Sequence, residues 1–270
     1  MADYRATDAE LTAVADAIRT KGSTSSPLAW PNGFVSAVQA IPSGGGSGKE
    51  DDIIDGTISE YSNESVTEIR RYAFAGCYAL TSAAFPAATV IGYLGFCYCS
   101  SLTTISFPAV TKISSYAFSG CSNLQSADFP SATEICNYAF DNCGKISTVS
   151  FPNAESIGNR AFGICLSLTT VSFPKVTTIG SSAFYNCLAL QTAYFDRLES
   201  INQDAFKLGG LSSLYLLGSS VCTLAHSNAF SSTRIGGWRG TGYIYVPASL
   251  LSAYQAADNW SFFSSQFRSA

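Results

Sequence analysis

Hydrophobic and polar residues recur in the same order every 22 residues through the middle of the chain. In one unit, Leu102, Ile105 and Phe107 are separated by polar residues, and the alternation of the last two is typical of a short strand. Pro108 follows, and since proline has no N–H to donate, it ends the strand. We expect residues 115–121 to form a helical turn on the outer side, which leads into the next unit.

Equivalent residues form five columns along the chain. The columns contain Ile69, Ile91, Ile113, Ile135, Ile157, Ile179 and Ile201; Phe74, Phe96, Phe118, Phe140, Phe162, Phe184 and Phe206; Cys77, Cys99, Cys121, Cys143, Cys165 and Cys187; Leu80, Leu102, Leu124, Ile146, Leu168 and Leu190; and the pairs that begin with Phe85, Phe107, Phe129, Phe151 and Phe173, each followed by proline. A 22-residue unit is too short to bury its own apolar side chains, so neighbouring units stack and share one core. We therefore expect Phe118, Phe140 and Phe162 to lie directly over one another.

The predicted fold class is α/β, as a leucine-rich-repeat solenoid with 22-residue repeats, a parallel sheet of short strands and helical turns on the outer side. Residues 1–41 contain apolar residues at helical spacing behind a Thr7–Glu10 capping box, and we expect a helical attachment segment there. Residues 42–52 are expected to be a Gly/Ser-rich linker. Residues 53–217 are assigned to the solenoid with a half-repeat cap at its start, and residues 218–270 to a C-terminal capping region, because solenoid ends must be covered.

Composition excludes several classes of protein. Hydrophobic residues make up 47% of the chain and charged residues 13%, which excludes a disordered chain or a soluble coiled coil. The net charge of −4 does not favour nucleic acid as a partner. The charge is uneven, because residues 1–68 carry 11 acidic and 4 basic residues, whereas residues 69–270 carry 8 and 11. The two parts are therefore expected to present different surfaces.

The repeat unit, seen at residues 157–178 and 179–199, resembles the BspA-like leucine-rich-repeat family over roughly residues 58–217. The resemblance implies a right-handed, curved solenoid that binds proteins or surfaces without catalysis, and many relatives are bacterial surface proteins. Residues 11–21 followed by 34–41 resemble a leader on phage or prophage tail-associated proteins of gut Gram-positive bacteria. The chain starts without the basic and apolar regions of a secretory signal peptide, so a virion or cytoplasmic location is expected. The alternative is a cell-surface location reached by an unrecognised route.

The cysteine column suggests either disulfides or a metal site, but both are disfavoured. Stacked equivalent residues point the same way, which suits the disulfide dihedral angle poorly, and no second column of ligands converges on the sulfurs. We expect buried thiols that act as small hydrophobic residues. Cys97 and Cys136 lie outside the column.

Other candidate motifs fail on spacing. Residues 44–49 lack the flanking residues of a phosphate-binding loop, and the acidic residues of 50–55 lack the spacing of an EF-hand. His226 is the only histidine, and no nucleophile and orienting group accompany it in a triad pattern. We expect a protein that is not an enzyme and has no catalytic residue, no metal and no cofactor.

Two polar columns flank the inward strand residues and should line the concave face. The candidate ligand-binding residues are Thr104, Ser106, Ser126, Asp128, Thr148, Ser150, Thr170, Ser172, Thr192 and Tyr194. They are either soluble, strand-compatible residues without a role in binding or a recognition surface of hydroxyl groups, in which Asp128 and Tyr194 are the best individual candidates. The leading hypothesis is a phage or prophage tail-associated protein that binds a protein or glycan on a host surface and joins a larger assembly through its N-terminal segment. The alternative is a bacterial cell-surface adhesin.

Overall fold

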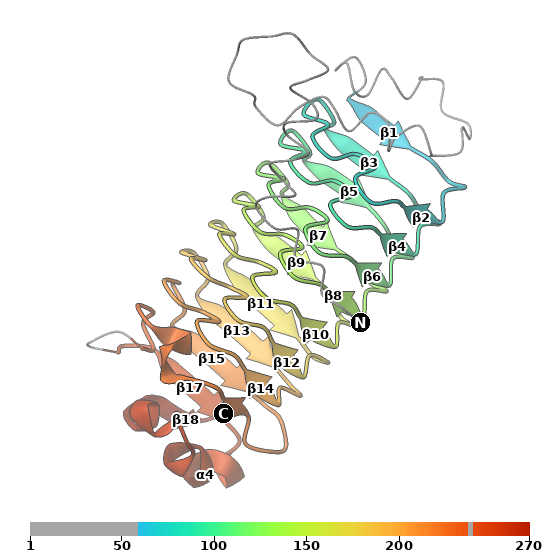
Figure 1. Ribbon diagram of the computed structural model, residues 1–270. Helices are drawn as coiled ribbons and strands as arrows, with labels where there is room; N and C mark the ends of the chain where they lie inside the picture. Colours follow the sequence, from blue (N-terminus) through green and yellow to red (C-terminus); the bar gives the residue numbers. More distant parts are fainter. Residues whose placement is uncertain (1–58, 237–239) are drawn as a thin grey trace.

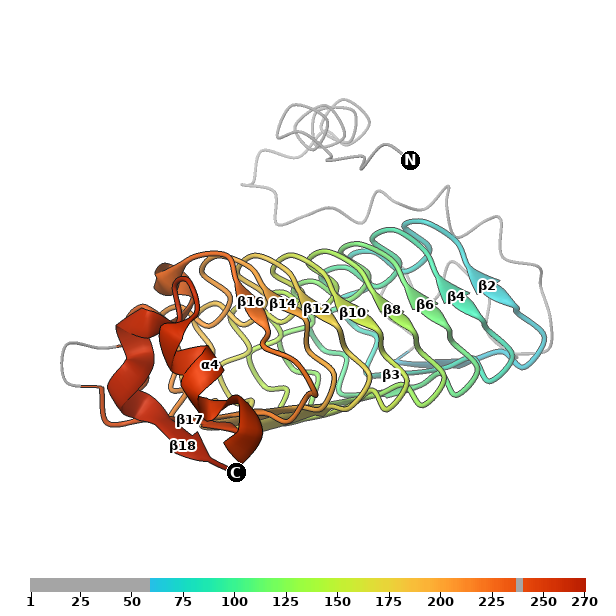
Figure 2. The same cartoon turned by 90° about the horizontal axis from the view of Figure 1, so that it is seen from below.

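The computed structural model describes residues 59–236 and 240–270, which form a parallel β-solenoid (Figure 1). The predicted N-terminal helical segment and the linker at 42–52 lie outside the described residues. Each coil runs through a longer strand, a tight bend, a two-residue strand and a series of turns before it returns one step further along the axis. Figure 2 shows the coils following one another along an elongated body.

The longer strands lie side by side along one face of the solenoid. They are β1 (Glu60–Ser62), β3 (Ser82–Ala84), β5 (Thr104–Ser106), β7 (Ser126–Asp128), β9 (Thr148–Ser150), β11 (Thr170–Phe173), β13 (Thr192–Phe195), β15 (Ser213–Leu216), β17 (Tyr243–Val246) and β18 (Phe267–Ser269). Hydrogen-bonded neighbours among these strands run parallel, and each residue pairs with the equivalent residue of the next coil, as Thr170 does with Thr192. We call the surface formed by the outward side chains of these strands the long-strand face.

The two-residue strands form a second, continuous ladder of eight parallel strands. They are β2 (Glu68–Ile69), β4 (Val90–Ile91), β6 (Lys112–Ile113), β8 (Glu134–Ile135), β10 (Ser156–Ile157), β12 (Thr178–Ile179), β14 (Ser200–Ile201) and β16 (Thr223–Leu224). The isoleucine column points inward here, and each isoleucine is opposite the next one in register. Because β16 pairs with β14, the solenoid continues beyond residue 217.

The helical turn predicted over residues 115–121 is absent, and a series of turns takes its place. The N–H of Ala117 donates to the carbonyl of Ser114 within the coil at 3.1 Å, whereas the N–H of Tyr116 donates to Asn137 of the next coil at 3.0 Å. Tyr116 and Gly120 have positive φ angles of 60° and 76°, which no α-helix accommodates. The neighbouring coil offers carbonyl acceptors at every second residue, so the backbone bonds between coils instead of closing a helix. Helix is therefore scarce in the described part of the chain, and the α/β class needs correcting towards a mostly β solenoid.

Two columns of phenylalanine rings fill the core. Phe118, Phe140 and Phe162 lie directly over one another, with centroid distances of 5.2 and 5.4 Å and interplanar angles of 7° and 2°, which confirms the predicted stacking. The second column includes Phe129 and Phe151, whose rings stack at 5.5 Å. Rings of the two columns meet at tilted or edge-on angles, an arrangement that aromatic pairs favour.

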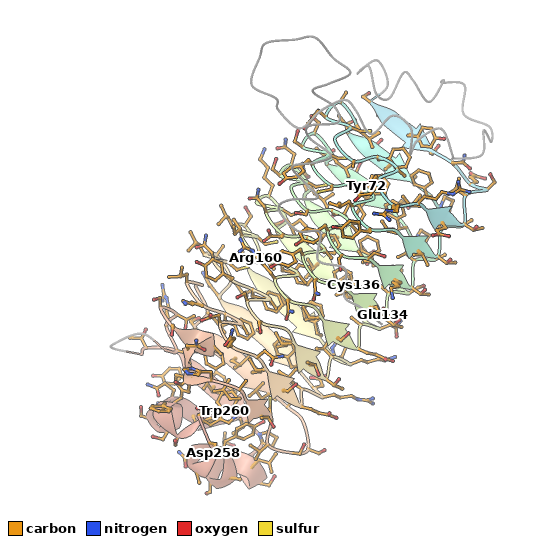
Figure 3. All side chains as sticks on the ribbon, in the orientation of Figure 1. Tyr72, Glu134, Cys136, Arg160, Asp258 and Trp260 are labelled. Carbon is orange, nitrogen blue, oxygen red and sulfur yellow. The ribbon has the colours of Figure 1, made fainter. Side chains whose placement is uncertain are left out.

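Bulky side chains cover the C-terminal end of the core. Four helical segments occur in this region: η1 (Ser227–Phe230), η2 (Ala248–Leu250), α4 (Leu251–Ala256) and η3 (Ser261–Gln266). Trp260 packs beside Phe230 at 5.8 Å and donates its indole N–H to the carbonyl of Cys222 at 2.6 Å. Figure 3 shows Trp260 at this end of the molecule. At the other end, Tyr61 packs on Phe74 and Phe85, each at 5.6 Å.

Candidate recognition surface

The ten residues predicted for ligand binding all lie on the long-strand face. Because side chains alternate along a strand, the residues on either side of an inward residue point to solvent. In β7, for example, Ser126 and Asp128 are exposed while Ala127 between them is buried. The same pattern holds for Thr104 and Ser106 of β5, where the residues on both sides of Ile105 are exposed.

Register brings the predicted residues of successive coils together into two rows. Ser126 is opposite Thr148, and Asp128 is opposite Ser150. Further along, Thr170 is opposite Thr192, and Ser172 is opposite Tyr194. Of the ten, all but Thr192 and Tyr194 are exposed, and these two are half-buried. The structure therefore presents rows of outward side chains that are rich in hydroxyl groups.

Tyrosines replace the small hydroxyl residues at the C-terminal end of this face. The ring of Tyr194 stacks on that of Tyr215 at 4.5 Å, and Tyr215 stacks on Tyr245 at 4.4 Å with an angle of 8°. Tyr243 meets Tyr245 edge-on at 6.4 Å, and the guanidinium of Arg268 lies 4.3 Å from the centroid of the Tyr243 ring. We call these five residues the tyrosine–arginine cluster.

Sequence reasoning identified only Tyr194 of this cluster. The 22-residue motif decays after residue 206, and the strands that carry Tyr215 and Tyr245 follow at spacings of 21 and 30 residues. The alternation in Tyr243-Ile244-Tyr245-Val246 is the sequence signal for the other tyrosines, because it predicts a strand with two exposed rings. It does not predict which strand lies next to this one.

The hydroxyl group of Tyr215 remains protonated at neutral pH. Loss of solvation within the stack raises the pKa of Tyr215, and the neighbouring phenols of Tyr194 and Tyr245 raise it further. Tyr215 can therefore both donate and accept a hydrogen bond through its hydroxyl group, while Arg268 supplies a positive charge.

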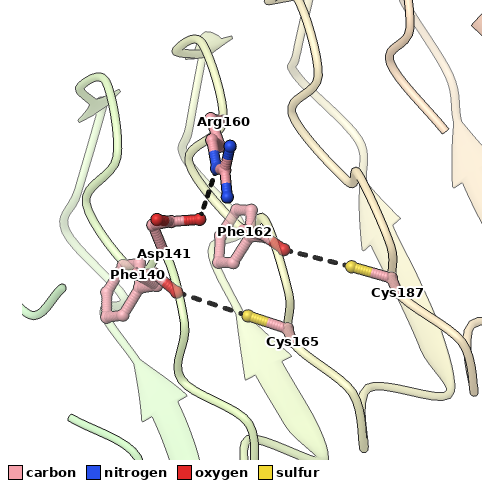
Figure 4. Close-up of polar contacts among 6 residues, drawn as sticks. All are labelled: Phe140, Asp141, Arg160, Phe162, Cys165 and Cys187. Atoms are coloured by element: carbon pink, nitrogen blue, oxygen red, sulfur yellow. Dashed lines mark hydrogen bonds and ion pairs between the residues drawn. The ribbon is translucent and has the colours of Figure 1, made fainter. Parts of the chain in front are cut away.

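The cysteine column is structural. Five thiols of the column each donate a hydrogen bond to the carbonyl of a phenylalanine in the preceding coil, namely those of Cys99, Cys121, Cys143, Cys165 and Cys187. The distances are 3.4 Å from Cys165 to Phe140 and 3.0 Å from Cys187 to Phe162 (Figure 4). Burial raises the pKa of the Cys187 thiol to about 12, so it is protonated and a poor nucleophile. The nine cysteines are thiols outside any disulfide, and within the described ranges no group of three or more possible metal ligands comes together.

His226 has a local structural role. Its Nδ1 accepts a hydrogen bond from the backbone N–H of Asn228 at 3.1 Å, which caps the start of η1. The only histidine of the chain is therefore used at a helix end.

An ion pair links two coils on the turn side of the solenoid, which includes residues 138–144 and 160–166. The Nε of Arg160 donates to Oδ1 of Asp141 at 2.8 Å (Figure 4). The guanidinium carbon of Arg160 lies 5.5 Å from the centroid of the Tyr185 ring. Burial raises the pKa of Asp141, although Arg160 opposes this shift. The pair lies away from the long-strand face, and we assign it to the structure of the turns.

Comparisons with solved structures give leucine-rich-repeat proteins. A leucine-rich repeat protein from Bacteroides ovatus is 23% identical with a TM-score of 0.45, and the match covers 67% of this chain and 59% of that protein. This chain therefore spans about three fifths of the length of that protein. The leucine-rich repeat protein of T. pallidum is 24% identical with a TM-score of 0.45, covering 72% of this chain and 81% of the other. A leucine-rich cell surface protein from Faecalibacterium prausnitzii is 19% identical with a TM-score of 0.39, covering 77% and 82%.

No curated protein sequence matches the chain significantly. Across the described residues, no helix combines the length and the apolar character needed to cross a bilayer. The model of the BspA type leucine-rich repeat region matches residues 58–154 and 133–240, which together make up more than half of the chain. With the 22-residue period and the stacked coils, this match shows that the chain belongs to the BspA-type leucine-rich-repeat family.

Proposed function

We propose that this protein is a non-catalytic recognition scaffold whose long-strand face binds a protein or glycan on a cell surface. Membership in a leucine-rich-repeat family suggests a protein-binding or adhesion scaffold. The observation that carries the proposal is the long-strand face itself, where the outward residues of successive strands form rows of hydroxyl groups that end in the tyrosine–arginine cluster. Such a surface can make many hydrogen bonds, and its aromatic groups offer apolar contact area.

Binding of the fluorescently labelled full chain to a panel of intact bacterial cells, measured by flow cytometry, tests the proposal. The double variant Asp128→Ala with Tyr194→Ala should bind more weakly than the wild type at an unchanged melting temperature. A matched double variant, Glu155→Ala with Tyr185→Ala, also removes one acidic side chain and one tyrosine ring, both outside the long-strand face, and should bind like the wild type. Equal loss in both double variants, or a fall in melting temperature that accounts for the loss, would leave the face with only a structural role.

Treating the cells before binding distinguishes the two ligand classes. Periodate cleaves vicinal diols of glycans, whereas a protease removes exposed protein. Loss of binding after one treatment alone identifies the class of the ligand.

We further propose that residues 1–41 join the solenoid to a phage or prophage tail. The support is the likeness of residues 11–21 and 34–41 to tail-associated leaders, together with the acidic charge of residues 1–68, which differs from the remainder. Deletion of residues 1–48 should abolish incorporation into purified tail particles while leaving the circular dichroism of the solenoid unchanged. Incorporation that survives the deletion would favour the alternative, a cell-surface adhesin of the same family, for which protease shaving of the producing cells should release the protein.

A further inference from the structure

The tyrosine–arginine cluster is organised differently from the rest of the long-strand face. From β5 to β11, the outward side chains are serines, threonines and Asp128, each too small to form an anchor on its own. From β13 to β18, the cluster adds four phenol rings and a guanidinium, and Tyr243 keeps 39% of its surface exposed. Tyrosine and arginine are the residue types that dominate binding energy in protein interfaces, where weaker polar contacts surround them.

Arg268 has no acidic partner within the described residues. Its Nη1 donates to the carbonyls of Ser265 at 2.9 Å and Phe267 at 2.7 Å, and its guanidinium lies over Tyr243. These bonds hold the side chain in place but leave its charge without a counter-charge, and the other guanidinium nitrogens keep donors available. A carboxylate on a partner is therefore the group that complements this end of the face.

The geometry of the stack favours a protein segment over a glycan. The rings of Tyr194, Tyr215 and Tyr245 lie face to face at 4.4–4.5 Å, so the faces inside the stack are turned towards one another. What the stack presents to solvent is a row of ring edges and hydroxyl groups, which suits side chains and backbone amides better than the flat face of a sugar ring. Stacking also restricts the rings before binding, and this reduces the entropy lost when a partner docks.

We propose that the tyrosine–arginine cluster is the binding hot spot of the long-strand face and that it takes an acidic segment of a protein, with an Asp or Glu carboxylate on Arg268 and an adjacent apolar side chain against the tyrosine edges. This inference rests on the proposed function and goes further by naming the partner class and the end of the face that binds it.

The experiment pans a random dodecapeptide library, displayed on filamentous phage, against the immobilised full-length chain. The selected peptides are then synthesised with a fluorescein label, and their dissociation constants are measured by fluorescence polarisation. We expect the selected sequences to share an Asp or Glu next to an aliphatic or aromatic residue. Arg268→Gln and Tyr215→Ser should each weaken binding by roughly 30-fold or more, the size expected when a hot-spot side chain is lost. Arg268→Lys should recover only part of the affinity, because lysine lacks the planar fork of donors.

The control variants are Arg71→Gln, which removes an arginine beside the rings of Tyr72 and Tyr93, and Tyr138→Ser, which removes a ring stacked on Tyr116 at 4.6 Å. Arg71 and Tyr138 lie outside the long-strand face, and both variants should bind the selected peptides like the wild type. Circular dichroism and melting temperature confirm that every variant is folded. Peptides that bind Arg268→Gln and Tyr215→Ser normally but lose affinity for Asp128→Ala, at the other end of the long-strand face, would overturn the hot spot while sustaining the proposed function of the face. Enrichment of no sequence over the blank support, or loss of the acidic residue from the selected set, would overturn the partner class. Binding of a neutral oligosaccharide array that depends on Tyr215 would overturn it in favour of a glycan.

Discussion

Truncation of a core ring tests the stacking that holds the coils together. Phe140 is fully buried and lies between Phe118 at 5.2 Å and Phe162 at 5.4 Å, with Phe129 and Phe151 beside it at 5.9 and 5.8 Å. Phe140→Ala removes the whole ring and leaves a cavity in the middle of the column. Neighbouring coils are held in register by backbone hydrogen bonds on both sides, such as that from the N–H of Phe140 to the carbonyl of Ala161 at 2.7 Å, so the structure has little freedom to collapse into the cavity.

The expected loss is about 3–5 kcal/mol in the free energy of unfolding, the range measured for truncation of buried aromatic residues to alanine. Transfer of about 150–250 Å² at about 25 cal/mol per Å² gives at most about 4–6 kcal/mol, and the loss is smaller because alanine keeps the Cβ and the unfolded chain already buries part of this area. The loss of stacking with two parallel neighbours adds to this term.

Urea denaturation followed by far-ultraviolet circular dichroism measures the effect through the midpoint and the slope. Phe262→Ala is the matched control, because the ring of Phe262 is 73% exposed and its removal should cost less than about 0.5 kcal/mol. Phe140→Leu keeps part of the volume and reports on the same site if the alanine variant does not fold. A loss below about 1 kcal/mol for Phe140→Ala, or an equal loss at Phe262, would refute the view that shared phenylalanine columns stabilise the solenoid.

Three further results are expected. Ile164→Asn should raise the free energy of unfolding, measured by urea denaturation, by about 1 kcal/mol. Ile164 has a φ of 57°, which is costly for a β-branched residue, while Asn142 holds the equivalent position with a φ of 60°. An unchanged free energy of unfolding would show that the turn relaxes around isoleucine. Ellman's reagent at pH 8 should react with at most one thiol of the native protein, that of Cys136, which is the one cysteine that is only partly buried. The other thiols should react only in denaturant, because burial raises the pKa of thiols such as that of Cys187 to about 12. Rapid reaction of more than one thiol in the native protein would contradict this. Burial raises the pKa of the Asp141 carboxyl group, so the folded protein binds a proton there more tightly than the unfolded chain does. The free energy of unfolding of the wild type, relative to that of Asp141→Asn, should therefore increase as the pH falls from 7 through the titration of this carboxyl group. A decrease in paired urea denaturations would mean that the ion pair with Arg160 outweighs burial.

The turn regions show where reasoning from the sequence failed. A run such as Ser115-Tyr116-Ala117-Phe118 has the composition of a helical turn, and only the position of the next coil reveals that alternate N–H groups bond across the gap to residues such as Asn137. The same holds for the positive φ of Tyr116, because tyrosine at a left-handed position is not a local preference. Both features depend on residues of the next coil, which local patterns do not contain.

The sequence by itself determined the repeat, the inward columns and the alternation that sends Asp128 and Tyr194 to solvent, because period and side-chain direction are properties of the backbone geometry. The tertiary structure alone decided which strands follow β13 on the long-strand face. Once the period is lost, nothing in the residues between Tyr215 and Tyr245 says that a 30-residue excursion returns to the same edge of the sheet. Only the pairing of β17 with β15, and of β18 with β17, brings Tyr245 over Tyr215 and places Arg268 over the ring of Tyr243. Strand pairing between distant segments is a property of the whole folded chain, and for that reason the cluster becomes visible only in three dimensions.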